Sequence, residues 1–195
     1  MAALDRIDLQ IVGLLRKNAR LSNKELAAKV GLAPSTCLVR TRLLQQEGVI
    51  TGFRAEVDTA KLGVGLQAMI AVRLKRHYKP DVEAFRQHAL DLPEVVRLYH
   101  VAGPIDFLAH VWARDPEHLR DLAMTAFTAR EEVSHIETEL IFEHISCQEL
   151  PSFVGGSPER LEEPPCGRQA VRYSSKPRGN TVARGLPTGV DRKTA

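Results

Sequence analysis

The chain has 195 residues, of which 44% are hydrophobic, and a formal net charge of +3 at pH 7. This length can hold two small domains with real cores, whereas no apolar run approaches about 18 residues and no charged-then-apolar leader opens the sequence, which argues against a membrane protein. The three cysteines are scattered and form no CxxC pair, as expected in a reducing compartment. We therefore expect a cytoplasmic protein with no membrane partner.

The charge is spread unevenly along the sequence. Residues 1–60 hold 9 Lys and Arg against 6 Asp and Glu, residues 61–150 hold 10 against 14, and residues 151–195 hold 8 against 4. A basic N-terminal part ahead of an acidic middle favours a polyanion-binding domain joined to a body of another kind.

Residues 5–48 show the apolar spacing of helices. Asp5 is a candidate N-cap for the first helix, because apolar residues recur behind it every three to four positions. The run "SNKE", which starts at Ser22, is a capping box for a second helix, and Gly31 is suited to end that helix.

A third helix is expected to begin at Pro34 and to end at Gly48, with the buried stripe centred on Cys37. Thr41 can satisfy its hydroxyl on the carbonyl of Cys37. Ser35, Val39 and Arg42 fall opposite that stripe, and Thr36 and Arg40 lie on one flank. The first half of the helix thus projects hydroxyls, an aliphatic group and two guanidinium groups. Such a mixture suits the major groove of DNA, although a solvated helix face would look the same. Residues 49–57 follow as a short strand or wing.

Residues 66–145 change period and read as strand, helix, strand, strand, helix, strand. The two middle strands are joined through residues 102–104 as a hairpin, and Asp115 with Pro116 can start the second helix. This βαββαβ order predicts a ferredoxin-like domain, so the fold class is α+β. Residues 151–195 hold 6 of the 11 prolines and 6 of the 13 glycines with few periodic apolar residues, which predicts a disordered tail.

The run "LDRIDLQIVGLLRKNARLSNKELAAKVGLAPSTCLVRTRLLQQEGVITGF" resembles the helix-turn-helix of the Lrp/AsnC (feast/famine) transcriptional regulators, and about residues 4–147 resemble the whole family. The resemblance implies a DNA-binding domain over residues 1–60, winged-helix-like and with a linker strand, and an ACT-like effector-binding and oligomerisation domain over residues 61–150. It implies binding to double-stranded DNA, at residues 34–46 above all, and a homodimer or higher homo-oligomer. The candidate DNA-binding residues are Ser22, Pro34, Ser35, Thr36, Val39, Arg40 and Arg42. The family usually has Ser where Ala33 stands.

The resemblance also implies an effector site near the hairpin, where the family pattern is Gly-Asp-aromatic-Asp. This sequence reads Gly103-Pro104-Ile105-Asp106, so only its first and last residues match. Thr138 matches a family threonine near the same pocket. The candidate effector-binding residues are Gly103, Asp106 and Thr138, and an amino acid is one possible ligand. The alternative is that Gly103 serves only the turn and Asp106 only the local backbone.

Two functions of other classes remain open at this point. The seven histidines form no HExxH motif or His–Cys cluster, and neither GxSxG nor a P-loop occurs, so we expect no enzyme, no metal and no cofactor. Siroheme decarboxylases resemble the same two-domain fold, however, and His100 and His110 are the residues such chemistry would use. The chain would otherwise be a ligand-sensing module that does not bind DNA. The basic tail either adds phosphate contacts or is passive.

Overall fold

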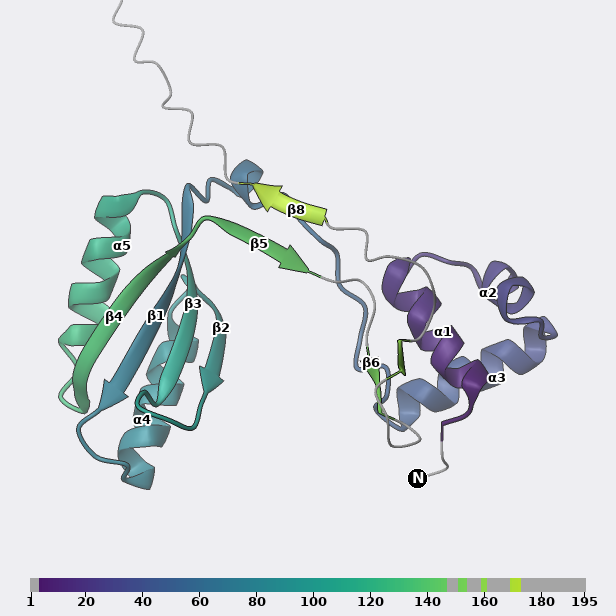
Figure 1. The fold of residues 1–195 in the computed structure, drawn as a ribbon, viewed down its shortest axis with the longest axis horizontal. Coiled ribbons are helices and arrows are strands. Elements are labelled where there is room, and N and C mark those ends of the chain that lie inside the picture. Colours follow the sequence, from purple (N-terminus) through teal and green to yellow (C-terminus); the bar gives the residue numbers. More distant parts are fainter. Residues whose placement is uncertain (1–3, 147–150, 154–158, 161–168, 173–195) are drawn as a thin grey trace, which may run out of the picture.

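The computed structural model describes residues 4–146, 151–153, 159–160 and 169–172. Two units, each with its own hydrophobic core, follow one another along this part of the chain (Figure 1). None of its helices is both long and apolar enough to cross a lipid bilayer.

The N-terminal unit consists of α1 (Arg6–Lys17), α2 (Asn23–Val30) and α3 (Pro34–Gln46). The expected caps are present: the Asp5 carboxylate accepts the Asp8 N–H, the Ser22 hydroxyl accepts the Glu25 N–H, and Gly31 adopts the left-handed conformation at φ 70°. Each helix buries one stripe against the other two, and the fully enclosed residues are Ile11, Leu15, Leu26, Ala27, Cys37 and Leu44.

Residues 49–57, predicted as a short strand or wing, do not form a strand, and residues 51–58 have no regular secondary structure. They are extended but exposed, and no ladder of backbone hydrogen bonds holds them in the described part of the chain. Alternation shows only that a segment is extended, and a strand also needs a neighbour, which the described residues do not supply to this segment. A short 3₁₀ turn, η1 (Thr59–Leu62), then leads into the second unit.

The second unit is the predicted βαββαβ domain. Its sheet contains β1 (Leu66–Leu74), β2 (Val95–His100), β3 (Phe107–Ala113) and β4 (Val133–Ile141), in the order β2-β3-β1-β4 with every neighbouring pair antiparallel. Helix α4 (Lys79–Asp91) connects β1 to β2, and α5 (Pro116–Leu122) with the π-helical turn η2 (Ala123–Thr128) connects β3 to β4. This is the ferredoxin-like arrangement.

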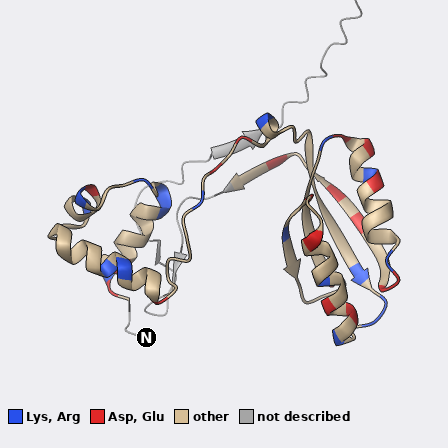
Figure 2. Ribbon diagram, turned by 180° about the vertical axis from the view of Figure 1, so that it is seen from behind, with Lys and Arg blue, Asp and Glu red and all other residues tan. Residues whose placement is uncertain are grey.

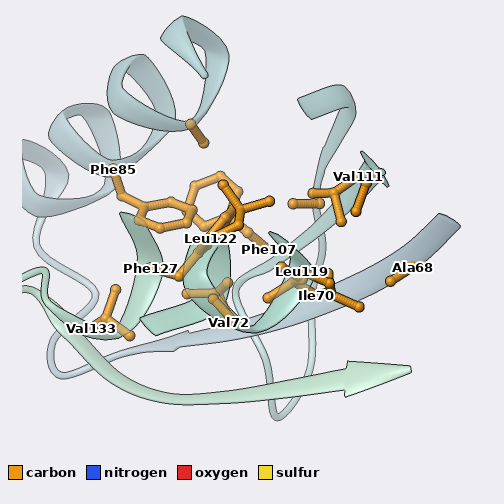
Figure 3. Close-up of a cluster of buried hydrophobic side chains, with 14 of the residues drawn as sticks. Ala68, Ile70, Val72, Phe85, Phe107, Val111, Leu119, Leu122, Phe127 and Val133 are labelled. Carbon is orange, nitrogen blue, oxygen red and sulfur yellow. The ribbon is translucent and has the colours of Figure 1, made fainter. Parts of the chain in front are cut away.

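Both connecting helices pack on one face of the sheet. Phe85 of α4, Phe107 of β3 and Phe127 of η2 are fully buried, and the Phe85 and Phe107 ring centroids lie 4.9 Å apart (Figure 3). Around them lie alternate residues of β1 and β3, which include Ala68, Ile70, Val72, Ala109 and Val111. Because side chains alternate along a strand, the intervening residues project from the other face, on which no helix lies.

The last predicted strand is divided. β4 ends at Ile141, Phe142 is 85% exposed, and β5 (Glu143–Ser146) continues beyond it. The described parts of residues 151–172 differ from the expectation of a chain without regular structure. β6 (Pro151–Ser152) pairs with β7 (Glu159–Arg160), and β8 (Gln169–Arg172) pairs antiparallel with β5 (Figure 1). Backbone pairing along an open strand edge needs no apolar periodicity, so composition did not reveal it. The rest of the predicted tail lies outside the described residues.

Candidate functional site

Helix α3 presents a polar and aliphatic outer face opposite its buried stripe. Cys37 and Leu44 are enclosed, and the Thr41 hydroxyl donates to the Cys37 carbonyl at 2.9 Å, as the sequence predicted. Ser35, Thr36, Val39 and Arg42 are all exposed, and Val39 exposes 65% of its surface. Figure 2 colours the Lys and Arg positions along the ribbon of this unit's helices in blue. The helix therefore offers hydroxyls, a branched aliphatic group and a cation on one side.

Arg40 differs from the free cation that the helical spacing implied. Its Nη1 atom lies 2.6 Å from Oδ2 of Asp5 and 2.8 Å from Oδ1 of Asp8, so its guanidinium binds the start of α1. These carboxylates, Asp8 first, raise the pKa of Arg40. The pKa of Asp5 lies below its ordinary value, mainly because its carboxylate accepts the Asp8 N–H and further because of Arg40.

Ser22 and Pro34 lie where α2 and α3 meet. The Ser22 hydroxyl is part of the α2 capping box and donates to the Glu25 carboxylate at 2.7 Å, which lowers the pKa of Glu25. The carbonyl of Pro34 accepts a hydrogen bond of 2.7 Å from Nδ2 of Asn23. Sequence reasoning missed this role of Asn23, because only the folded turn brings the two residues together. Ala33 makes no side-chain cap, so the Asn23 bond holds the start of α3 instead.

The β2–β3 hairpin contains two of the candidate effector residues. Gly103 has φ 138°, which side-chain-bearing residues rarely adopt, and nothing lies within 4 Å of the position that a Cβ would take. Asp106 is only 2% exposed, and its Oδ2 atom accepts the Leu74 N–H at 2.7 Å. The predicted ligand carboxylate therefore fastens the end of β1 to the hairpin.

The other carboxylate oxygen of Asp106, Oδ1, accepts no hydrogen bond from the described residues. Nδ1 of the exposed His77 lies 2.7 Å from Oδ1, yet the geometry is not that of a hydrogen bond, and Oδ1 is a buried acceptor without one. Arg73 supports the same hairpin by donating to the Pro104 carbonyl at 2.7 Å. Residues of β1 thus hold the hairpin, and Oδ1 of Asp106 is buried without a hydrogen bond from the described residues.

Thr138 is not beside the hairpin in a single copy of the chain. It is exposed on the edge strand β4 and pairs with Ile70, whereas Asp106 precedes β3 on the other side of β1. The order β2-β3-β1-β4 separates the three effector candidates into two groups.

The histidines considered for tetrapyrrole chemistry have ordinary surroundings. The His100 ring stacks on Phe107, with centroids 4.7 Å apart, and the His110 Nε2 atom lies 2.9 Å from the Gln67 side-chain oxygen. Burial lowers the pKa of His110, with Arg97 contributing to the shift. Within the described ranges, no three His, Cys, Asp or Glu side chains are grouped so that they could hold a metal ion.

Comparisons with known proteins match both units. The family model described as "Winged helix-turn-helix DNA-binding" matches residues 4–51, and the one described as "Lrp/AsnC ligand binding domain" matches residues 67–150. The HTH-type transcriptional regulator AldR of Mycolicibacterium smegmatis is 44% identical over 142 residues, which cover 73% of this chain and 83% of that protein. This chain belongs to the Lrp/AsnC family.

Other members agree across the same region. The leucine-responsive regulatory protein of Rhizobium meliloti is 34% identical, with 74% of this chain and 94% of that protein covered. A Neisseria meningitidis transcriptional regulator solved in complex with L-Met superposes with a TM-score of 0.67 at 28% identity, with coverage of 71% and 89%. For Escherichia coli AsnC the TM-score is 0.64 at 28% identity, with coverage of 71% and 91%. The Lrp/AsnC proteins matched are transcriptional regulators and not enzymes, as the sequence predicted.

Proposed function

We propose that this regulator reads double-stranded DNA through the outer face of α3, with Ser35, Thr36, Val39 and Arg42 as the contacting side chains. The observation that carries the proposal is the difference between the two arginines of α3. The Arg42 guanidinium is exposed and has no ion-pair partner among the described residues, whereas Arg40 is held by two carboxylates. A free guanidinium beside hydroxyls can bind guanine or phosphate, and Val39 can contact a thymine methyl.

Arg42→Ala is expected to weaken binding to a DNA sequence selected by the wild-type protein. The loss should be about 1–3 kcal/mol if Arg42 reads a base, and the salt dependence should fall by about one unit of slope if it binds a phosphate. Fluorescence anisotropy at several salt concentrations measures both quantities. Arg120→Ala is the matched control, since it removes the same charge from the exposed surface of α5 in the other unit. Equal affinity of both variants would contradict the assignment of Arg42.

We further propose that two copies dimerise through the helix-free face of the sheet. Met69 and Ala71 of β1 and Leu108 and Trp112 of β3 alternate with core residues and are only partly buried. They form an apolar surface in the middle of this face, and two polar residues beside them, His110 and Gln67, contact each other. Nε1 of Trp112 is buried without a hydrogen-bond partner in the described part of the chain. A second copy would cover the apolar surface, and paired α3 helices would then bind two half-sites.

Leu108→Glu should therefore convert the dimer into a monomer, because a carboxylate would have to be buried between the sheets. Multi-angle light scattering at micromolar concentration measures the mass. Leu62→Glu is the control, because Leu62 is 64% exposed on η1 and lies outside the apolar surface. A monomeric wild-type protein, or a Leu108→Glu variant that stays dimeric, would exclude this interface.

For the effector we propose a small molecule with an ammonium group, such as an amino acid, bound near Gly103 and Asp106. Oδ1 of Asp106 accepts no hydrogen bond among the described residues and would accept from an ammonium once the exposed His77 ring, whose Nδ1 lies 2.7 Å away, moves aside. Thr138 would join the site from another copy, since β1 separates it from the hairpin. Thermal shift assays with the individual amino acids should reveal at least one that raises Tm. Thr138→Val should reduce that shift without changing the unliganded Tm, and an unchanged shift would remove Thr138 from the site.

A further inference from the structure

The two carboxylates that hold Arg40 are the two halves of the α1 capping box. Asp5 uses Oδ1 to accept the Asp8 N–H at 2.9 Å, and Asp8 uses Oδ2 to accept the Asp5 N–H at 3.2 Å. Their remaining oxygens, Oδ2 of Asp5 and Oδ1 of Asp8, both accept from Nη1 of Arg40. Each carboxylate thus caps α1 with one oxygen and binds α3 with the other.

This network is partly withdrawn from solvent. The exposed fractions of the Arg40 and Asp8 side chains are 31% and 16%, so water screens the contact less than it screens an ordinary surface ion pair. Arg40 lies one residue beyond Val39 and two before Arg42, in the half of α3 that carries the exposed hydroxyls. The contact therefore fixes α3 to α1 next to the side chains offered to DNA.

The charges around Arg40 also argue against a role as a DNA ligand. One guanidinium faces two carboxylates, so the cluster as a whole is not cationic. Both carboxylates contact Nη1, so a phosphate that approaches the other guanidinium nitrogens of Arg40 would face the negative charge of two neighbouring carboxylates. Arg42 has no such neighbours among the described residues and remains the exposed cation of α3.

We propose that Arg40 is a positioning residue, which fixes the angle and rotation of α3 against α1 and so presents Ser35, Thr36, Val39 and Arg42 correctly, without touching DNA itself. The inference rests on the proposed function, since it takes α3 to be the helix that enters the groove. The proposal predicts a change in DNA affinity opposite to the one that net charge alone would give. Removing the negative charge of Asp8 should weaken sequence-specific binding, although the domain becomes more attractive to a polyanion.

The test uses full-length protein and a DNA sequence that the wild type enriches from a random pool. Arg40→Met and Asp8→Asn should each weaken binding at least about fivefold, and the double variant should bind no more weakly than Arg40→Met alone, because both changes break one contact. Glu56→Gln is the matched control for Asp8→Asn: it also removes one negative charge, but from the exposed linker outside α1 and α3. It should leave binding unchanged or tighten it.

A second measurement separates positioning from contact. Arg40→Met should leave the slope of log affinity against log salt unchanged, whereas a residue bound to phosphate would lower the slope by about one unit. Circular dichroism identifies any variant that fails to fold, and Asp8→Asn, which keeps the shape of the side chain, then carries the test. If Asp8→Asn tightens binding, or Arg40→Met lowers the slope, Arg40 contacts DNA and the inference is wrong. A wild-type protein that enriches no sequence would instead overturn the proposed function.

Discussion

Phe107→Ala should destabilise the sheet domain by about 3–5 kcal/mol, the largest effect we expect of any single substitution. Phe107 is fully buried, stacks against His100 and lies 4.9 Å from the Phe85 ring, so truncation leaves a cavity beneath both α4 and the sheet. A site enclosed by strand backbone on one side and by other rings on the other cannot collapse to fill that cavity.

Chemical denaturation followed by tryptophan fluorescence measures this loss. Trp112 is the single tryptophan of the chain and lies on β3, so its emission reports on the sheet domain alone. Phe142→Ala is the control, because it removes the same ring from a position that is 85% exposed, and it should cost little. Equal losses for the two variants would mean that burial in this core does not determine the stability of the domain.

Gly65→Ala should cost about 3 kcal/mol or more, at the upper end for overpacked sites. Gly65 precedes β1, and its N–H donates to the Ala113 carbonyl at 3.0 Å. A Cβ at this position would lie 2.0 Å from the Arg114 carbonyl oxygen and 3.1 Å from its carbon. The obstacle is backbone at the end of β3, so no side-chain rotation relieves it, and the first pairing of β1 with β3 has to open.

Gly31→Ala provides the comparison. Nothing lies within 4 Å of a Cβ there, and only the positive φ of 70° opposes the substitution, which should cost about 1–2 kcal/mol. Fluorescence of Trp112 should report the Gly65 change, and helical circular dichroism the Gly31 change. Amide hydrogen exchange at Leu66 and Ala113 should increase in Gly65→Ala if the strand end opens. Unaltered exchange together with unaltered stability would show that the close approach is easily relieved.

Local signals in the sequence were sufficient for the helices and the topology. A cap needs only residues three positions apart, as in Ser22 and Glu25, and the change of apolar period at residue 66 marks the start of β1. Residues 49–57 alternate as a strand or wing would, but alternation does not reveal whether a partner strand exists. The same limit applies to β8, whose pairing depends on the open edge of β5 rather than on its own residues.

The candidate sites were harder to predict, because tertiary contacts decide which polar groups are free. Helical spacing puts Arg42 opposite the buried stripe of α3 and Arg40 on its flank, and it shows both as projecting cations. Only the fold brings Asp5 and Asp8, more than 30 positions earlier, against Arg40. The family resemblance makes Asp106 a ligand candidate, yet its contact with the Leu74 N–H joins residues 32 positions apart. The sequence therefore located the candidate sites, but it did not show which charged side chains are engaged in contacts within the fold.

The separate cores of the two units restrict how a signal can pass through this protein. No buried cluster among the described residues combines side chains of α1–α3 with those of the sheet domain, and exposed chain at residues 51–58 joins them. The described residues of one copy therefore contain no tightly packed relay of side chains between the hairpin and α3. On the proposed function, we expect an effector bound to the sheet domain to alter transcription by changing how several copies are arranged, and with it the spacing between their α3 helices. The interfaces between copies would then set the distance between the α3 helices, and with it the spacing of the DNA half-sites that the regulator can bind.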